Sequence, residues 1–597
     1  MFAMIASFLL SRTLVPTLAM YLLKPHALGI GHSFHVTQAV SYSKNPLVRF
    51  QEWFNLGFNE IRDKYYGMLV AFMSHRNKFV AGFLFAVAIS FALIPWLGRD
   101  FFPLVDAGQI KIHIRAPVGT RVEETARLFD RIESDIRRAI PANELASVID
   151  NIGLTVSGIN LVYNNTGTIG PQDGDILIAL HKGHAPTDSY VRRLREFLPQ
   201  QYPGSTFSFL PADIISQILN FGAPAPIDVQ VMGPNNEENF KYAQILQRDI
   251  AKISGVADLR IQQAYNYPQF LVDVDRIRAK KVGVTERDVT NSLVVTLAGS
   301  GQVSPAYWLN KANGVAYSIV AQAPSFRVQS LSDLENIPVV GSEAHDPQIL
   351  GGLATITRTK TAAVASHYAV QPVIDIFATP DRRDLGAIAS DIEKVLQSHE
   401  KERPKGATIT LRGQVQTMNT AFSGLLFGLL AAIVLIYLLI VVNFQSWSDP
   451  FIIVAALPAA LAGIVWMLFA THTTLSVPAL TGAIMCMGVA TANSILVVSF
   501  ARERLAHTGD PIRAAMEAGF GRFRPVLMTA LAMIIGMAPM ALGLGEGGEQ
   551  NAPLGRAVVG GLITATCATL FFVPVLFGMI HGRQPRIIKT EGAIEHG

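Results

Sequence analysis

Seven stretches of the chain are apolar over about 20 residues each, the length that a helix needs to cross the roughly 30 Å core of a bilayer. The first two stand apart, and the other five follow a polar stretch of about 320 residues. This spacing predicts a polytopic α-helical membrane bundle interrupted by one large domain outside the bilayer. The seven predicted spans cover residues 1–23, 79–98, 420–442, 450–470, 477–500, 525–545 and 557–580.

Basic residues in the short loops predict the orientation of this bundle, because cytoplasmic loops carry an excess of lysine and arginine. The 24–78 connection, the 501–524 loop and the 583–597 tail are all rich in these residues. The 546–556 loop instead carries Glu546 and Glu549 against one arginine. We therefore expect the connection and the tail in the cytoplasm, and both the large domain and Met1 outside.

The first predicted span, residues 1–23, has no basic segment before it and contains Arg12 in its middle. This pattern differs from that of a signal peptide. Either the span inserts unaided with its N-terminus outside, or further spans precede it. We favour the second interpretation.

The connection between the first two spans contains a predicted helix from about Pro46 to Phe72, in which aromatic and apolar residues alternate with charged ones. An amphipathic helix rich in Trp, Tyr and basic residues can lie in the membrane interface. Packing of the same helix against the bundle from the cytoplasmic side suits the pattern equally well.

The large polar domain repeats one pattern of strand, turn and helix. Gln109–Ala116 alternates between isoleucine and polar side chains, which predicts a half-buried strand. An amphipathic helix follows, and Thr120 and Glu123 have the spacing of a capping box at its start. The same order recurs from Ile227 and from Val373.

Repeated βα units predict α+β subdomains of split-βαβ type, with helices on one face of a mixed sheet. We place the first subdomain at 99–225 and the second at 226–418, with an insertion near 258–360. The five-span block then covers 419–582.

Composition narrows the class of protein. Only 16% of the residues are charged, against about 25% in soluble proteins. A net charge of +4 without basic clusters interleaved with aromatics gives no sign of nucleic-acid binding. Cys486 and Cys567 both lie in apolar runs, so the polar domain has no disulfide framework. With no nucleophile motif, phosphate loop or zinc spacing, we expect neither an enzyme nor a bound cofactor.

Three segments carry a pattern that resembles a known family. The segments are Gly98–Glu133, Phe444–Gly463, and Met487–Leu505 continued by Arg524–Gly543. In order and spacing they resemble the permeases of the resistance–nodulation–division (RND) class, in its hydrophobe/amphiphile (multidrug) efflux group. The resemblance covers essentially the whole chain and corresponds to a little over half of such a permease, starting at its sixth span.

This resemblance implies a trimeric protein of the bacterial inner membrane whose large domain is periplasmic. Its porter subdomains would pass hydrophobic or amphiphilic small molecules outward, driven by protons. The insertion would dock on an outer-membrane channel, and a periplasmic adaptor protein would complete a tripartite pump. An N-terminal half carrying the first five spans and the first porter pair would be missing from this chain. The alternatives are a non-coupling partner protomer and an inactive truncated fragment.

The resemblance also places proton-path candidates. In the family, two aspartates of the fourth span face a lysine of the tenth span, assisted by a threonine and an arginine of the eleventh. Arg522 and Thr529 match the eleventh-span positions, whereas Ala492 stands at the position of the lysine. This replacement predicts lost or altered proton coupling.

Other polar residues inside the predicted spans have two interpretations each. Arg12 either satisfies backbone carbonyls or reaches an interface, or it replaces the missing lysine as a counter-ion. Thr491, Asn493 and Ser494 either pack helices through hydrogen bonds or line a path for protons or water.

Candidate substrate contacts in the large domain are aromatic, although each of them also suits a hydrophobic core: Tyr163, Phe207, Phe209 and Phe221. Metal export is not expected, because soft cations prefer thioether or thiolate ligands. No Met or Cys lies between Asp106 and Val231, and His181 and His184 have no evident partners in the sequence. We therefore predict no metal site.

Overall fold

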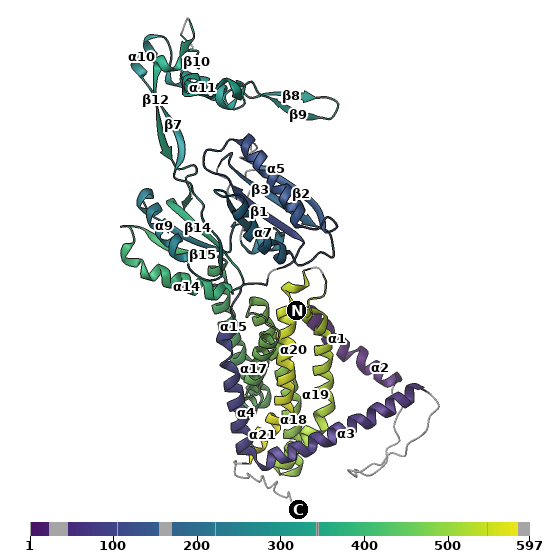
Figure 1. Ribbon diagram of the computed structural model, residues 1–597. Helices are drawn as coiled ribbons and strands as arrows, with labels where there is room; N and C mark the ends of the chain where they lie inside the picture. The colour runs from purple at the N-terminus through teal and green to yellow at the C-terminus, as the bar shows by residue number, and fades with distance from the viewer. Residues whose placement is uncertain are drawn as a thin grey trace, which may run out of the picture. The chain divides into compact units, whose positions relative to one another are not determined.

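The computed structural model describes residues 2–22, 46–103, 105–153, 170–220, 223–341, 343, 346–545 and 547–582 (Figure 1). The chain forms two compact units, Met1–Tyr65 and Tyr66–Gly597, which are described separately. The predicted tail at 583–597 and the pocket candidates Tyr163 and Phe221 lie outside the described residues.

The first unit contains α1 (Phe2–Arg12), α2 (Leu14–Leu22) and most of α3 (Pro46–Ser74). Thr13 separates α1 from α2, and its hydroxyl donates to the Leu9 carbonyl at 2.7 Å. Such bonds from Ser and Thr bend helices. The apolar stretch that the structure describes, Ile5–Tyr21, is shorter than a full span. The described residues contain six helices of membrane length, and the predicted first span is not among them.

The predicted amphipathic helix is confirmed as α3, and its last turns belong to the second unit. There Leu69 and Met73 are buried, and the Tyr66 ring meets Phe520 edge to face at 5.6 Å. These last turns of α3 pack against the bundle, which agrees with the second of the two interpretations of this helix.

The membrane bundle of the second unit is packed through small residues. A Cβ atom on Gly463 would lie 2.4 Å from the Gly560 carbonyl oxygen, so α17 and α20 approach closely, as small residues allow in membrane helices. The helices are α4 (Arg76–Phe91), α15 (Gln414–Phe444), α16 (Ser448–Val454), α17 (Leu457–Ala470), α18 (Val477–Thr508), α19 (Pro511–Ala541), α20 (Ala552–Cys567), a π-helical turn (Ala568–Phe572) and α21 (Val573–His581).

The first α/β subdomain is a four-stranded sheet in the order β2-β3-β1-β4. Its core combines Ile110, Ile112 and Ile114 of β1 with Phe129 of α5 and Leu194 of α7. The elements are β1 (Gln109–Arg115), α5 (Val122–Ala139), β2 (Leu145–Ile152), β3 (Asp173–Leu180), α7 (Thr187–Gln201), β4 (Thr206–Leu210) and α8 (Ile214–Leu219).

The predicted capping box at the start of α5 is wrong. The N-cap residue is Arg121, without a side-chain capping bond. The Thr120 hydroxyl is already used in the preceding turn, where it donates to the Pro117 carbonyl at 2.7 Å.

The second α/β subdomain has the strand order β13-β14-β5-β15, with β6 also pairing with β14. Val229 and Ile376 of the sheet pack against Leu246 of α9 and Ile388 of α14. All strand pairs described in both sheets are antiparallel. The prediction of a mixed sheet is therefore wrong for both subdomains. The elements are β5 (Ile227–Met232), α9 (Asn236–Ile250), β6 (Val256–Ile261), β13 (His367–Tyr368), β14 (Gln371–Pro380), α14 (Leu385–Ser398) and β15 (Thr408–Gly413).

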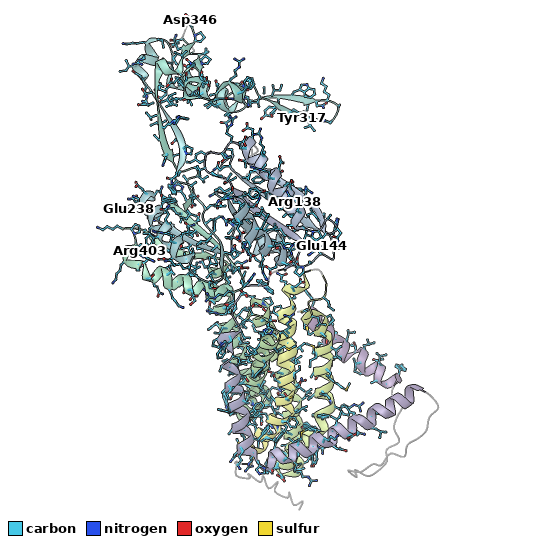
Figure 2. All side chains as sticks on the ribbon, in the orientation of Figure 1. Arg138, Glu144, Glu238, Tyr317, Asp346 and Arg403 are labelled. Carbon is cyan, nitrogen blue, oxygen red and sulfur yellow. The ribbon has the colours of Figure 1, made fainter. Side chains whose placement is uncertain are left out.

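An insertion leaves the second subdomain through a two-stranded ribbon of β7 (Tyr267–Val274) and β12 (Ala354–Thr361). Its small core contains Val289 of α11 (Glu286–Ala298) and Leu350 of α13 (Leu350–Leu353). A hairpin of β8 (Ala306–Asn310) and β9 (Val315–Ile319) carries the exposed Tyr317 (Figure 2). The remaining elements are α10 (Arg276–Lys281), α12 (Leu331–Glu335), β10 (Pro338–Val339) and β11 (Gln348–Ile349).

Candidate functional site

The two α/β subdomains are joined by ion pairs between residues far apart in the sequence. Arg195 on α7 donates from Nε and Nη2 to the Asp258 carboxylate at 3.2 and 2.8 Å, and from Nη1 to Asp381 at 3.3 Å. Asp258 belongs to β6 of the second subdomain, and its side chain is almost fully buried. Burial raises the pKa of Asp258, although the guanidinium of Arg195 acts against this shift.

A second set of ion pairs lies on the polar face of β1. Arg115 donates to Asp173 at 2.9 and 3.3 Å and to the Gln262 carbonyl at 3.2 Å, which again joins the two subdomains. His113 Nδ1 lies 2.8 Å from Asp175 Oδ1, and both side chains are buried. The alternation in β1 predicts that this face meets solvent; instead it is partly or fully buried, because the second subdomain lies near it.

Arg260 of β6 is the one arginine of this junction without a carboxylate partner among the described residues. It is 7% exposed, and its Nε and Nη2 atoms are buried without hydrogen-bond partners. Nη1 reaches only the Asp258 carbonyl, at 3.4 Å, and the guanidinium lies 5.3 Å from the Phe377 ring centre. Burial lowers the pKa of Arg260 to about 10, so the side chain stays charged at neutral pH.

The polar face of the second sheet contains a pair of buried carboxylates on neighbouring strands. The Gln230 amide donates to Asp228 at 2.9 Å and to Asp375 at 3.0 Å, and Gln263 donates to Asp375 at 2.7 Å. Burial, reinforced by the second carboxylate, raises the pKa of Asp228 to about 8. Burial also raises the pKa of Asp375. The pair therefore retains a proton near neutral pH.

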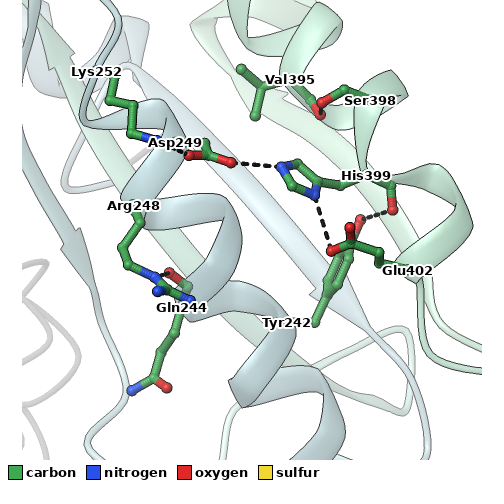
Figure 3. Close-up of polar contacts among 9 residues, drawn as sticks. All are labelled: Tyr242, Gln244, Arg248, Asp249, Lys252, Val395, Ser398, His399 and Glu402. Atoms are coloured by element: carbon green, nitrogen blue, oxygen red, sulfur yellow. Dashed lines mark hydrogen bonds and ion pairs between the residues drawn. The ribbon is translucent and has the colours of Figure 1, made fainter.

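Figure 3 shows a third polar cluster, which joins α9 to the end of α14. His399 lies between two carboxylates, with Nε2 2.7 Å from Asp249 and Nδ1 3.1 Å from Glu402. The hydrogen bond with Asp249 raises the pKa of His399. Tyr242 of α9 donates to the His399 carbonyl at 3.1 Å. No pattern in the sequence pairs these residues.

Two of the polar residues predicted in the membrane helices lie together. Thr529 of α19 donates to the Asn493 amide oxygen at 2.9 Å. Ser494 and Thr569 are 3.0 Å apart and fully buried, so α18 is also bonded to the π-helical turn. Thr491 donates to its own helix backbone, at Met487. The neighbouring Ala492 is exposed.

The two predicted arginines have other contacts. Arg522 stacks over Phe500 with 4.6 Å to the ring centre, and its Nε is buried without a hydrogen-bond partner. Arg12, in the first compact unit, lies over Phe8 at 5.8 Å. Neither contact assigns a role in proton transfer.

The described aromatic candidates contribute to hydrophobic packing. Phe209 is buried in the core of the first subdomain, beneath Arg195 at 5.1 Å. Phe207 packs against the same core beside Tyr202. A shallow pocket at the edge of this subdomain has no aromatic lining; its walls are Val105, Ala107, Gln109, Ala212, Asp213, Ile214, Ile215 and Gln217.

His184 has two neighbours that the sequence does not reveal. Its Nδ1 lies 2.8 Å from the Ala185 carbonyl, and its Nε2 lies 4.0 Å from Asp106. Asp106 also accepts hydrogen bonds from the Thr187 backbone and hydroxyl. Among the described residues, no group of three or more His, Cys, Asp or Glu side chains has the geometry to hold a metal ion.

Curated relatives of this chain include transporters of two kinds. The nickel-cobalt-cadmium resistance protein NccA of Alcaligenes xylosoxydans xylosoxydans is 26% identical over 553 residues, covering 89% of this chain and 49% of NccA. The multidrug resistance protein MdtC of Proteus mirabilis is 24% identical over 529 residues, covering 87% of this chain and 48% of MdtC. The chain thus spans about half the length of the curated relatives it matches.

The fold is shared with a solved structure titled "X-ray crystal structure of a heavy metal efflux pump, crystal form II". The TM-score is 0.75 at 23% identity, covering 88% of this chain and 52% of the other. Residues 1–581 match the family described as AcrB/AcrD/AcrF. With its membrane bundle, α/β subdomains and matched length, this chain belongs to the AcrB/AcrD/AcrF family of permeases.

Proposed function

We propose that the chain supplies part of an RND efflux permease in the bacterial inner membrane. The family match over residues 1–581 carries this proposal, and the six helices of membrane length agree with it. Because the relatives are about twice as long, activity requires the elements that they carry outside the matched half. A periplasmic adaptor, an outer-membrane channel and a trimeric assembly are proposed from the family, as is a periplasmic location of the α/β subdomains.

For the cargo, we propose a divalent metal cation in place of the amphiphile that the sequence suggests. Relatives such as NccA are named for nickel, cobalt and cadmium resistance. Four carboxylates and His113 lie at the junction of the subdomains, and oxygen and imidazole donors suit such cations. Arg195 occupies Asp258 and Asp381, and Arg115 occupies Asp173, so three of the four carboxylates are already paired. A cation would therefore enter only after those ion pairs separate.

Export of amphiphilic molecules is the second candidate. The matches to MdtC and to the antibiotic efflux pump membrane transporter ArpB of Pseudomonas putida favour it. The described aromatic residues favour it less, because Phe209 is part of a core and Phe207 packs against that core.

A deletion of the coding region in the host distinguishes the two cargoes. The deletion strain and its complemented form are grown with graded nickel, cobalt, cadmium or zinc salts, and separately with ethidium or bile salts. Greater sensitivity to the metals alone, reversed by complementation, supports cation export. Sensitivity to the amphiphiles alone supports the second candidate, and no change in either series contradicts an efflux role under these conditions.

A further inference from the structure

One end of the membrane bundle contains a buried carboxylate, Asp449, in the first turn of α16. Its side chain is 2% exposed. Within the described membrane-length helices, Asp449 is the only buried acidic residue. A buried carboxylate in a membrane helix is costly and marks a functional hypothesis.

Two basic side chains from other helices face this carboxylate. Arg502 Nη1, on α18, lies 3.5 Å from Asp449 Oδ2 and donates to the Phe444 carbonyl at 2.6 Å. His581 Nε2, at the end of α21, lies 3.2 Å from Asp449 Oδ1. This contact has ion-pair distance but is not aligned as a hydrogen bond. One carboxylate thus connects three helices.

The His581 ring has one free protonation position. A carboxylate only accepts, so in the neutral ring the proton belongs on Nε2, facing Asp449. Nδ1 is buried without a hydrogen-bond partner among the described residues, and the ring stacks on Phe577 at 4.2 Å. Nδ1 is therefore the ring position at which a further proton would bind. The charge of the Asp449–Arg502–His581 cluster then changes from zero to +1.

The other helices that pack on α21 place few charges near it. From α4, Arg76 Nη1 lies 3.8 Å from a Cβ atom built on Gly582, so this cation approaches the end of α21. The surfaces of α3 and α19 at Gly578 are apolar, with Met73 and Ala515 nearest. Asp449 is the acidic side chain described at ion-pair distance from His581, whereas Glu517 of α19 is paired with Arg513. The attraction of Asp449 for the protonated ring opposes repulsion from Arg502 and Arg76.

The last span contains a π-helical turn, Ala568–Phe572, immediately before α21. Such turns often occur at functional sites and are places where helices bend. Thr569 within this turn is bonded to Ser494 of α18, next to the Asn493–Thr529 pair. Movement of α21 about this turn would therefore reach the polar residues at the middle of α18.

We propose that His581, paired with Asp449, is a proton-binding group at the cytoplasmic end of the bundle, and that its charge controls how firmly α21 is held. Protonation strengthens the pair with Asp449 and holds α21 in place, and deprotonation releases it about the π-helical turn. The cytoplasmic assignment follows from the basic 501–524 loop at the same end. A role for this proton in transport rests on the proposed efflux function; the binding of the proton does not.

Hydrogen exchange of the purified full chain in detergent tests the proposal without any transport. After correction for intrinsic pH dependence, protection of Val573–His581 should fall roughly 3- to 10-fold between about pH 6 and pH 8. The His581→Gln variant should show little pH response. The His581→Arg variant, permanently charged, should keep the protection of the acidic state at both pH values. His507→Gln, which removes an exposed histidine at the end of α18, should behave as the wild type.

A pH-independent α21 in the wild type would overturn the proposal, as would a full pH response in His581→Gln. If His581→Gln does not fold, the Arg variant decides: a pH response that survives there also contradicts the proposal. The complemented deletion strain provides the transport comparison. If the wild type and His581→Arg restore tolerance to the exported compounds equally, the proton at His581 has no role in transport, and the proposed binding of that proton is unaffected. No change in tolerance even with the wild type contradicts the efflux function and leaves the exchange result intact.

Discussion

Arg195 and Asp258 form a two-pronged ion pair across the two α/β subdomains, with N–O distances of 3.2 and 2.8 Å. Asp258 adopts the left-handed conformation, with φ +52°. The pair connects α7 of one subdomain to β6 of the other. Arg195 also donates to Asp381, which follows β14. With the contact of Arg115 to the Gln262 carbonyl, the pair is one of the polar connections across the junction.

Replacement of Arg195 by Ala should loosen this junction. It leaves Asp258 buried without its cation, a change that typically costs about 3–5 kcal/mol if the structure does not relax. We expect faster hydrogen exchange in β6 with little change in α21. Arg195→Lys should recover only part of the protection, because lysine cannot make the two-pronged contact. Arg192→Ala, which breaks an exposed pair with Asp188 on the same helix, should change stability by less than about 1 kcal/mol.

Arg260→Met should be neutral or stabilising in the closed junction. The guanidinium is buried with two unpartnered nitrogen atoms, and even complete buried ion pairs can often be replaced by apolar side chains of similar size without loss of stability. Thermal unfolding in detergent measures the change. A loss larger than about 1 kcal/mol would show that Arg260 stabilises the neighbouring carboxylates more than its own burial costs.

Asp228→Asn should remove a pH dependence of stability. In the native chain the pKa of Asp228 is raised to about 8, so between about pH 4 and pH 8 the folded state binds more protons than the unfolded state. Stability should therefore fall as pH rises through this window, by at most about 1.4 kcal/mol per unit. In the Asn variant that fall should be smaller, apart from the contribution of Asp375. An unchanged slope in the unfolding midpoint would contradict the assignment.

His399→Gln should lower stability mainly at acidic pH. The pKa of His399 is raised, so its contribution is fully present below the unfolded-state pKa of about 6.5 and is lost as pH rises through the folded value. We expect an effect below about 1 kcal/mol, since the cluster is partly exposed. Hydrogen exchange at the end of α14, measured at acidic and alkaline pH, checks the sign. Protection equal in both forms at acidic pH would contradict it.

Ala492→Lys tests whether the altered relay position weakens proton coupling. Ala492 is exposed beside Asn493, so a lysine should fit without loss of folding. In the complemented host, we expect export by the wild type to lack ordinary sensitivity to an uncoupler, and Ala492→Lys to change that sensitivity. Arg12→Ala is the companion variant. Ordinary proton dependence in the wild type, together with a silent Arg12→Ala, would contradict both altered coupling and the substitute-cation interpretation.

The sequence by itself determined the elements whose apolar spacing is regular. Ile110, Ile112 and Ile114 are buried at the period of a strand, and Ile388 and Ile392 at the period of a helix. In these elements the regularly spaced apolar residues are the buried ones, because each element has one apolar face that some neighbour must cover. The membrane helices of the last block were predictable from their length and apolar composition, because a helix that crosses a bilayer needs about 20 apolar residues whatever its neighbours are.

The tertiary structure alone decided which polar residues meet. His113 and Arg115 occupy the face of β1 that alternation assigns to solvent, yet His113 is 1% exposed because a second subdomain lies near it. Asp449 and His581 belong to different spans, and Arg195 and Asp258 to different subdomains. Local periodicity contains no information about such partners. Their pairing depends on how separate elements pack, and a buried charge is tolerated only where that packing supplies an opposite one.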